Sequence, residues 1–447
     1  MFSAQHLLDI LQSLPPCRSY QVAFSGGLDS TVLLHACLEI RTRINASVCA
    51  IHVHHGLHPD ADQWSSHCAE ICAEWGVKLV VERIHIAAKS SLEDRARRLR
   101  YRVLGQRNGP CEAVLSAQHA DDQVETLFLQ LMRGAGVEGL ASMPLLGGLG
   151  RGRLIRPLLG FRRDALRSYA QRHALRWIED SSNVNLRFDR NYLRHKVMPR
   201  IYHRWPSATQ TVGRSARWAA ESAAILHEVA AQDIQAYVQN QTLQMACLRH
   251  LSERRAANAL RFWIKSCGFR VPNENRMRTI LHQALVAGLD RIPVIHWQGA
   301  QIYRYRDTLY LEKPLPAAPR RSLSWSPEKT LEIPSLGLRL TTQRRLGCGL
   351  QQRVRESGLR VRFRGGGERI RLGGQHKDLK KLFQQAGIPP WRRALIPLFY
   401  ADRHLAAVGN LWISDEFAVT RADCTGLLIH IQNSAQSGDM EFWPETD

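Results

Sequence analysis

The stretch Ser25-Gly26-Gly27-Leu28-Asp29-Ser30 decides the fold that we expect for this chain. Residues 20–24 before it form a short apolar run typical of a buried parallel strand, and residues 31–38 after it have helical spacing. Adjacent glycines allow backbone conformations closed to other residues and leave room for a close ligand. The helix that follows points free N–H groups and its positive dipole end at the turn. The sequence therefore predicts a phosphate-binding loop, to which Ser25 and Ser30 add hydroxyl donors.

Asp29 is the unusual residue of this loop, because a carboxylate next to a polyphosphate repels it unless a divalent cation lies between them. We therefore interpret Asp29 as a Mg²⁺ ligand. The loop is not a Walker A motif, since no Gly-Lys-Ser or Gly-Lys-Thr occurs in the chain. A serine-rich turn that only caps the helix is the alternative. The six residues resemble the SGGxDS signature of the N-type ATP pyrophosphatases, which split ATP into AMP and pyrophosphate.

Length and charge indicate a multidomain protein with a polyanionic partner. A chain of 447 residues is long enough for two or three domains. It carries 61 Lys and Arg against 40 Asp and Glu, a net charge of +21. Such a surplus favours nucleic acid as a partner, and a basic but merely solvated surface is the alternative.

The sequence also favours a cytoplasmic location. The first six residues lack the basic and apolar regions of a secretory signal, and no apolar run is as long as a membrane span. The ten cysteines are scattered, with no Cys-x-x-Cys motif. We expect them to be reduced, mostly buried thiols rather than disulfides or zinc ligands.

Residues 16 to about 200 alternate between expected strands and helices, which predicts an α/β fold with a doubly wound parallel sheet. The expected strands are 20–25, 48–53, 79–86 and 113–116. Ligands of such sheets bind beyond the carboxyl ends of the strands. The histidines at 54, 55 and 58 follow the second strand, but no carboxylate or thiol completes a metal site there, so we expect polar residues at a nucleotide-binding edge.

A second polar cluster follows the 113–116 strand. If a helix begins near Ala120, then Asp122 and Glu125 are three residues apart and share a face near its N-terminus, close to His119. Burial would raise the pKa of such acids unless a cation lies beside them, and the cation could be Mg²⁺ or a substrate ammonium. Acidic residues that only complement the helix dipole are the alternative, which does not account for His119 and Glu125 together.

Two further motifs have competing interpretations. Arg97, Arg100 and Tyr101 lie on one side of an expected helix, as a phosphate-binding face or an ordinary solvated one. Residues 134–139 fit the pattern G-x-G-x-x-G, but they follow a helix instead of a strand, so we interpret them as a helix stop and flexible loop with Arg133 at its base.

Taken in order, the motifs resemble those of the tRNA(Ile)-lysidine synthase family. They are SGGLDS at 25–30, His55-Gly56-Leu57, Glu93-x-x-Ala96-Arg97-x-x-Arg100-Tyr101, His119-Ala120-Asp121-Asp122-Gln123-x-Glu125-Thr126, Arg133-Gly134, Arg156-Pro157-Leu158-Leu159, and Asp180-x-Ser182-Asn183 through Arg190-Asn191-x-x-Arg194. One departure is His58, where the pyrophosphatase subgroup with the H-G-L motif usually has arginine.

The resemblance implies the domain organisation that we expect. An ATP pyrophosphatase catalytic domain spans 1–200, a mostly helical tRNA-contacting domain 201–315, a linker or outer strands 316–350, and a small α+β basic tRNA-binding domain 351–435. In this last domain basic residues alternate with Phe363, Phe383 and Trp391, which suits a surface that follows phosphates. A small basic domain with a core of aromatic residues is the alternative, and both can hold.

The resemblance also implies the reaction. The C2 carbonyl oxygen of cytidine 34, in the CAU anticodon of a minor isoleucine tRNA, attacks the α-phosphate of ATP and pyrophosphate leaves. The amine of free L-lysine then displaces AMP, which forms lysidine and changes decoding from AUG to AUA. ATP and Mg²⁺ are the expected cofactors, and we keep a homodimer open beside a monomer. A tRNA-thiolating enzyme with the same loop and a noncatalytic tRNA-binding protein are the alternative functions.

The expected site residues fall into three groups. Ser25, Gly26, Gly27, Leu28, Asp29 and Ser30 bind ATP, with Asp29 as the Mg²⁺ ligand. Asp122 and Glu125 hold the lysine ammonium and accept its proton, because only the neutral amine can attack, and His119 and Arg133 accompany them. Contacts to tRNA or substrate are expected from Arg97, Asp180, Asn183, Arg190, Asn191, Arg194, Arg364, Lys380, Lys381, Trp391 and Arg392. The sequence leaves open whether Arg133, Arg190 and Arg194 contact the lysine carboxylate, phosphate or base.

Overall fold

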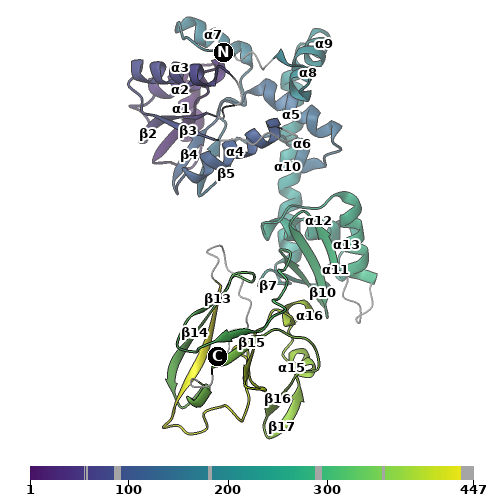
Figure 1. The fold of residues 1–447 in the computed structure, drawn as a ribbon. Coiled ribbons are helices and arrows are strands. Elements are labelled where there is room, and N and C mark those ends of the chain that lie inside the picture. The colour runs from purple at the N-terminus through teal and green to yellow at the C-terminus, as the bar shows by residue number, and fades with distance from the viewer. Residues whose placement is uncertain are drawn as a thin grey trace. The chain divides into compact units, whose positions relative to one another are not determined.

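The chain folds into two compact units, residues 1–229 and 230–447. The computed structural model describes residues 1–54, 56, 59–84, 92–179, 184–286, 294–354 and 358–433 (Figure 1). The boundary between the two units falls within one long helix, α10 (Ala208–Ile234). The first unit thus extends beyond the boundary at residue 200 that we expected for the catalytic domain.

Unit 1 is built on a six-stranded sheet in the order β3-β2-β1-β4-β6-β5. The first five strands in this order pair in parallel, and β5 pairs antiparallel to β6 at the edge. The chain therefore winds outward from β1 in both directions, which confirms the α/β doubly wound prediction. The strands are β1 (Ser19–Ala23), β2 (Ser47–His54), β3 (Leu79–Arg83), β4 (Glu112–Leu115), β5 (Leu146–Leu149) and β6 (Gly152–Ile155).

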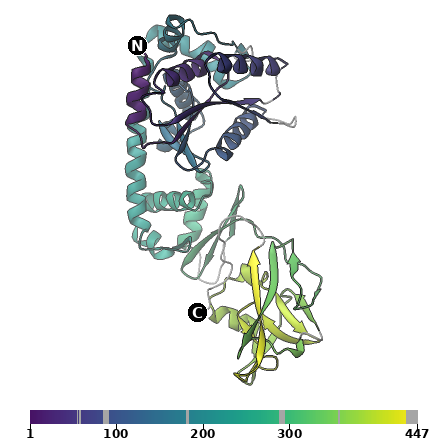
Figure 2. The ribbon, with the colours of Figure 1, turned by 90° about the vertical axis from the view of Figure 1, so that its left-hand side faces the viewer.

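Helices cover both faces of this sheet (Figure 2). One face forms the main core with α1 (Ala4–Gln12), α2 (Leu28–Glu39), α3 (Ala61–Glu74) and α7 (Arg163–Arg172). The other face packs Ile51, Val114 and Leu154 against Leu104 of α4 (Leu92–Gln106). Burial on both faces explains the continuous apolar runs of the central strands.

The remaining helices of unit 1 follow β4 and α7. They are α5 (Ala120–Met132), α6 (Val137–Leu140), α8 (Asp189–Tyr192), the π-helix η2 (Leu193–Val197) and α9 (Met198–Arg204). The G-x-G-x-x-G segment ends α5 as expected, with Gly134 at φ +68°. It then enters α6, so it is more ordered than the flexible loop that we predicted.

The first part of unit 2 combines helices with a five-stranded antiparallel sheet in the order β7-β8-β11-β10-β9. Helix α12 buries Ala256, Leu260, Trp263 and Ile264 at helical spacing, and these residues form the core with the sheet. The helices of this part confirm the helical middle domain that we expected, and the sheet adds strands to it. Its elements are β7 (Val238–Gln239), β8 (Thr242–Gln244), α11 (Met245–His250), α12 (Glu253–Ser266), α13 (Glu274–Val286), β9 (Val294–Trp297), β10 (Ala300–Tyr305) and β11 (Thr308–Glu312).

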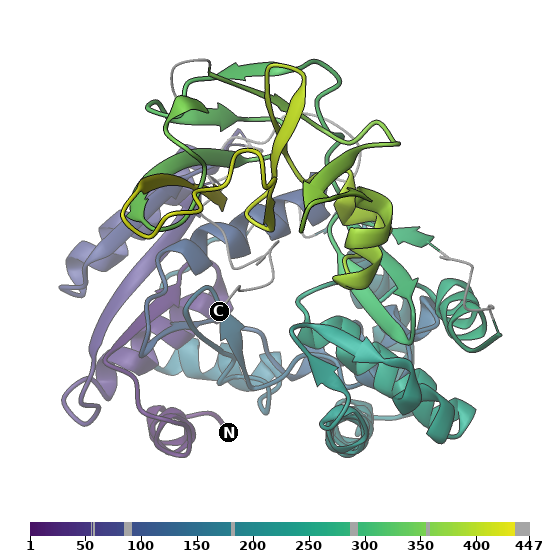
Figure 3. The ribbon, with the colours of Figure 1, turned by 90° about the horizontal axis from the view of Figure 1, so that it is seen from below.

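The second part of unit 2 contains two antiparallel sheets, β12-β15-β18-β19-β20 and β13-β14-β21, whose strands are drawn in green and yellow in Figure 3. Their core includes Trp325, Val361 and Phe399. Its strands are β12 (Leu323–Trp325), β13 (Leu331–Ile333), β14 (Leu338–Leu346), β15 (Leu359–Arg362), β18 (Leu398–Ala401), β19 (His404–Val408), β20 (Trp412–Ile413) and β21 (Thr425–Asn433). A hairpin of β16 (Arg369–Leu372) and β17 (Gln375–Asp378) leads to α15 (Leu379–Gln385) and α16 (Pro390–Arg393).

The segment 316–350, which we expected to be a linker or outer strands, contributes strands to these two sheets. Strand β12 pairs with β15, and β14 pairs with β21 over nine residue pairs from Leu338 to Leu346. The alternation of β14 is weak, since its last four residues are exposed, and this is why its composition resembled a linker. Residues 323–346 therefore belong to the C-terminal sheets.

Two further findings concern the helices and the cysteines of the described chain. Among the described residues, none of the helices combines the length and apolar character needed to cross a membrane. All ten cysteines are free, and half of them are buried.

Candidate active site

The segment 25–30 follows β1 and leads into α2, as the sequence predicts, with residues 28–30 in the first turn of that helix. Gly26 has φ +80°, and a Cβ atom there would lie 3.1 Å from Sγ of Cys68, so both conformation and space require glycine. Ser30 Oγ donates to the Gly27 carbonyl oxygen at 3.0 Å and lies 3.1 Å from Ser25 Oγ. Two serine hydroxyls thus hold the turn in place at the N-terminus of α2, where anions bind favourably.

His119 joins this loop to the second predicted cluster. Because β1 and β4 are neighbours in the sheet, the residues that follow them meet at one edge. His119 is 3% exposed, and its Nε2 atom lies 3.7 Å from Asp29 Oδ2 and 3.5 Å from Asp122 Oδ2. Its Nδ1 atom lies 3.4 Å from Asp121 Oδ2. One imidazole therefore contacts three carboxylates, one of them in the phosphate-binding loop.

The charges of this cluster shift one another's pKa values. Burial would lower the pKa of His119, but Asp122, Asp121 and Asp29 outweigh burial and raise it. For Asp121, burial is outweighed by hydrogen bonding to His119 and to the Arg163 backbone N–H, which lowers the pKa to about 2. Burial raises the pKa of Asp29 despite the nearby His119 and Arg163. The site thus favours a positively charged imidazole between carboxylates of unequal acidity.

Arg190 and Arg194 close the other side of the cluster. Arg190 Nε donates to Glu125 Oε2 at 2.9 Å, and its Nη2 donates to Asp122 Oδ1 at 3.1 Å. Arg194 Nε donates to Glu125 Oε1 at 2.7 Å, and its Nη2 donates to Asp122 Oδ1 at 2.9 Å. The carboxylate of Glu125 is 2% exposed. Two acids and two arginines that the sequence placed in separate motifs therefore form one buried ionic cluster.

Two residues at this site, Arg163 and Tyr202, were not predicted from the sequence. Arg163 Nε lies 3.8 Å from Asp29 Oδ1, and the Arg163 backbone N–H donates to Asp121 Oδ2 at 2.8 Å. The hydroxyl of Tyr202 on α9 donates to Asp121 Oδ1 at 3.3 Å. The N-terminus of α7, which follows the Arg156-Pro157 motif, is a signal that could have identified Arg163, whereas nothing near Tyr202 distinguishes it.

Asp29 has the properties of a ligand for a small divalent cation. Its Oδ1 atom is buried and lacks a hydrogen-bond partner among the described residues. No group of three described His, Cys, Asp or Glu side chains could enclose a metal ion. A Mg²⁺ ion usually takes one or two carboxylates together with waters and substrate phosphates, and this donor set fits that pattern.

Several predicted residues lie apart from the cluster. Arg97 is exposed and lies over the Tyr101 ring, with its Cζ atom 5.7 Å from the ring centroid. Arg133 is exposed at the end of α5, and Asn191 Nδ2 donates to the Asn185 carbonyl oxygen at 3.0 Å. Asp180 and Asn183 lie outside the described residues, as do His55, Leu57 and His58.

Some of the predicted residues of the C-terminal part have side chains exposed to solvent, and others have side chains in contact with neighbouring protein groups. Lys380 and Lys381 are exposed on α15. Arg364 lies 3.5 Å from a carboxylate oxygen of Glu368. Trp391 packs against three tyrosines, and Arg392 pairs with Glu312. Only the two lysines are therefore fully presented to solvent.

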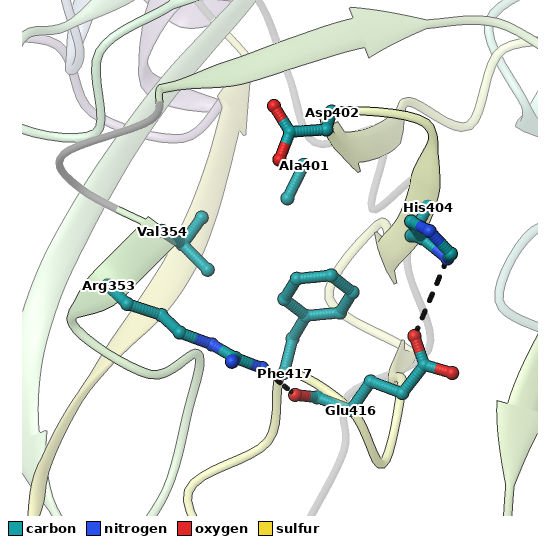
Figure 4. Close-up of a pocket in the computed structure, with 7 residues that line it drawn as sticks. All are labelled: Arg353, Val354, Ala401, Asp402, His404, Glu416 and Phe417. Carbon is teal, nitrogen blue, oxygen red and sulfur yellow. Dashed lines mark hydrogen bonds and ion pairs between the residues drawn. The ribbon is translucent and has the colours of Figure 1, made fainter.

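A cavity of about 330 Å³ in unit 2 contains none of the predicted site residues (Figure 4). An ion pair between His404 and Glu416 lies at its edge, with Nδ1 and Oε2 3.6 Å apart. The cavity is lined by Arg353, Val354, Ala401, Asp402, His404, Glu416 and Phe417. The ionic cluster of unit 1, rather than this cavity, is the candidate active site.

Three segments of the chain match known families of protein domains. Residues 3–201 match the PP-loop domain, 243–310 the TilS substrate binding domain, and 359–430 the TilS substrate C-terminal domain. The tRNA(Ile)-lysidine synthase of Alkalilimnicola ehrlichii is 39% identical over 93% of this chain and 94% of its own length. That of Coxiella burnetii is 37% identical over 93% and 94%, and that of Pectobacterium atrosepticum is 38% identical over 90% and 93%.

Proposed function

This chain belongs to the tRNA(Ile)-lysidine synthase family, and we propose from this membership that it joins lysine to C2 of cytidine 34 in the CAU anticodon of isoleucine tRNA. The contact of His119 with both Asp29 and Asp122 supports this proposal most directly. It places the phosphate-binding loop next to the acids that suit an amine. ATP activation and amine attack then occur at one site.

In the first step, the cytidine C2 carbonyl oxygen forms a bond to the α-phosphate of ATP and pyrophosphate leaves. The backbone N–H groups at the start of α2 and the hydroxyls of Ser25 and Ser30 bind the phosphates. Asp29 would hold Mg²⁺, which when bound neutralises phosphate charge. The positive charges of His119 and Arg163 beside Asp29 favour the build-up of negative charge at this edge of the sheet.

In the second step, the lysine amine forms a bond to C2 and AMP leaves with the former carbonyl oxygen. Asp122 and Glu125 hold the ammonium and accept the proton that it must lose. Both carboxylates already bind Arg190 and Arg194, so the ammonium has to share or replace guanidinium contacts. The freed or shared arginines are then available to the lysine carboxylate or a tRNA phosphate.

The exposed Lys380 and Lys381 are our proposed phosphate contacts in the C-terminal part, because exposed amines can pair with the tRNA backbone. Arg97, Arg133 and Arg364 stay as proposed contacts on the sequence pattern. The cytoplasmic location and a homodimer also stay as predictions.

The deciding experiment incubates the purified protein with isoleucine tRNA transcript, Mg-ATP and radiolabelled lysine, and measures label in acid-precipitated RNA. Three parallel reactions omit ATP, use a C34→U transcript, or use Asp29→Ala protein. We expect label only in the complete reaction. Pyrophosphate release without label would contradict the lysine assignment and point to another nucleophile. Absence of both signals would favour a noncatalytic tRNA-binding protein.

A further inference from the structure

Within unit 2, helix α16 inserts an aromatic ring among the tyrosines of the five-stranded sheet β7-β8-β11-β10-β9, which we call the middle sheet. Trp391 stacks on Tyr303 of β10, with ring centroids 4.1 Å apart and planes at 12°. Trp391 also makes edge-to-face contacts with two other tyrosines. Its ring centroid lies 5.4 Å from that of Tyr310, with planes at 75°, and 6.2 Å from that of Tyr305, with planes at 87°. Offset stacking and edge-to-face contacts are the favourable arrangements of aromatic pairs. Trp391 therefore has the environment of a packing residue.

A buried ion pair lies beside this aromatic cluster. Glu312 ends β11 and its side chain is 3% exposed. Arg392 Nε donates to Glu312 Oε1 at 2.8 Å, and the guanidinium also lies 6.0 Å from the Tyr310 ring centroid. A carboxylate this deeply buried is strongly destabilising unless a cation pairs with it. The pair therefore holds Arg392 against the middle sheet.

Two neighbouring arginines add to the same contact from both sides. Arg393 of α16 donates from Nη2 to the Tyr305 hydroxyl at 3.2 Å. Arg306, in the turn between β10 and β11, donates to the Gln384 carbonyl oxygen at the end of α15. The segment from α15 to α16 thus contacts one face of the middle sheet, over β10 and β11, through aromatic rings, a buried ion pair and a backbone carbonyl.

We propose that Trp391 and Arg392 form a latch with Tyr303, Tyr310 and Glu312, which holds the C-terminal part of unit 2 on the middle sheet. The inference rests on the proposed tRNA function, and it changes the part that two predicted residues play there. Trp391 and Arg392 are positioning residues that fix the distance between the tRNA-binding surfaces of the middle and C-terminal parts. They do not contact the tRNA.

The variant Glu312→Gln separates this latch from a direct tRNA contact by the direction of its effect. If Arg392 bound a phosphate, loss of the competing carboxylate would leave tRNA binding unchanged or tighter. If the latch positions the C-terminal part, Glu312→Gln weakens tRNA binding, as Arg392→Gln does, and the two changes are not additive. We expect a loss of about tenfold for each variant and for the double variant. Unchanged or tighter binding by Glu312→Gln would overturn the proposal.

The salt dependence of tRNA binding is a second measurement. Loss of a phosphate contact should change it, whereas loss of the latch should not. Loss of one phosphate contact lowers the slope of log K against log salt by about 1. We expect that decrease for the control Lys380→Ala, and an unchanged slope for Trp391→Leu and Arg392→Gln. A lower slope in Arg392→Gln would contradict the latch. Trp391→Phe should restore binding to within about twofold, because a ring can still stack on Tyr303.

A measurement without tRNA keeps failure of the latch distinct from failure of the proposed function. Urea unfolding of the wild type, both single variants and the double variant gives the coupling between Glu312 and Arg392 in the free protein. We expect a coupling of about tenfold in the unfolding equilibrium. Additive effects would overturn the latch even if tRNA binds, whereas strong coupling in a protein that does not bind tRNA would contradict only the proposed function. If Glu312→Gln does not fold, the pair Trp391→Leu and Tyr303→Leu replaces it in the cycle.

Discussion

Two glutamates in this chain are almost equally buried and both pair with arginine, but their surroundings differ. Glu125 in unit 1 is 2% exposed and binds Arg190 and Arg194, with Asp122 and His119 close by. Glu312 in unit 2 is 3% exposed and binds Arg392 beside the rings of Tyr310 and Trp391. Titratable groups surround the first glutamate, and aromatic rings surround the second.

The difference shows how a pair of glutamate and arginine can either form part of a ligand-binding site or hold two parts of the protein together. Around Glu125, several cations and anions share contacts, so an incoming ammonium can exchange with a guanidinium at modest cost. Around Glu312, Arg392 supplies the charge and the rings exclude water, so separation of the pair leaves a buried carboxylate uncompensated. Burial and pairing alone therefore do not distinguish the candidate active site from the latch, whereas the network of shared ion pairs does.

The largest expected effect is the loss of lysine transfer in Glu125→Gln. Removal of this carboxylate takes away the proposed ammonium site and proton acceptor, and general-base contributions are about 10²- to 10⁴-fold. Single-turnover transfer of labelled lysine to tRNA measures it. The matched control is Glu312→Gln, which should keep its rate at saturating tRNA. Equal rate losses in the two variants would remove the distinction between the glutamates.

The second effect is on stability and belongs to the latch. Glu312→Gln should lower the free energy of unfolding by about 3 kcal/mol, because it leaves Arg392 without its buried partner. Urea titration followed by circular dichroism measures this loss. A stability equal to that of the wild type would show that the pair does not fasten the two parts of unit 2.

The third effect concerns the acid side of the unit 1 cluster. Hydrogen bonds hold the pKa of Asp121 at about 2, below its ordinary value of 3.8. The stabilisation is therefore present above pH 3.8 and is lost as the pH falls towards 2. It amounts to about 2 kcal/mol, roughly half of which is lost by pH 3. Comparison of unfolding at pH 5 and pH 3 should show a smaller decrease in Asp121→Asn than in the wild type. Identical decreases would contradict the assignment.

The smallest expected effect comes from replacing arginine by lysine, which keeps the positive charge of the side chain but changes its shape. Such variants sharpen the comparison of the two glutamates. Arg392→Lys keeps a cation beside Glu312 but loses the planar group over Tyr310, so we expect a loss of about 1 kcal/mol in unfolding free energy. Arg194→Lys should cost more in lysine transfer than in stability, because Arg194 bonds both Glu125 and Asp122. The two variants are compared by urea unfolding and by the transfer assay. The reverse pattern would mean that the roles of the clusters are exchanged.

Much of the unit 1 site follows from the sequence because local rules place it. The apolar run at 20–24 and the glycine turn predict the loop, and the strand at 113–116 predicts where His119 emerges. Parallel strands bring these positions to one edge, so the meeting of Asp29, His119 and Asp122 could be anticipated. The pairing of Glu125 with Arg190 and Arg194 could not, since these arginines lie more than 60 residues away on short helices without a clear periodic pattern.

The latch escaped prediction for a related reason. A basic segment with an aromatic residue has the same composition whether it contacts RNA or packs against tyrosines, and only the fold shows that β10 and β11 present rings to Trp391. Strand β14 could not be distinguished from a linker because its last four residues, which include Arg344 and Arg345, are exposed. In both places the deciding partner lies far along the chain, where neither periodicity nor turn residues point to it.

The π-helix at Leu193–Val197 makes unit 1 sensitive to the length of the chain at this point. Arg194 lies within it and faces Glu125, while Tyr202 on the next helix faces Asp121. A π-turn contains one residue more than an α-turn, and each residue of an α-helix rotates the chain by about 100°. Deletion of one residue here would turn Tyr202 away from Asp121 while leaving every side chain of the site intact. Insertions and deletions at 193–197 should therefore be as damaging to activity as substitution of the charged residues themselves.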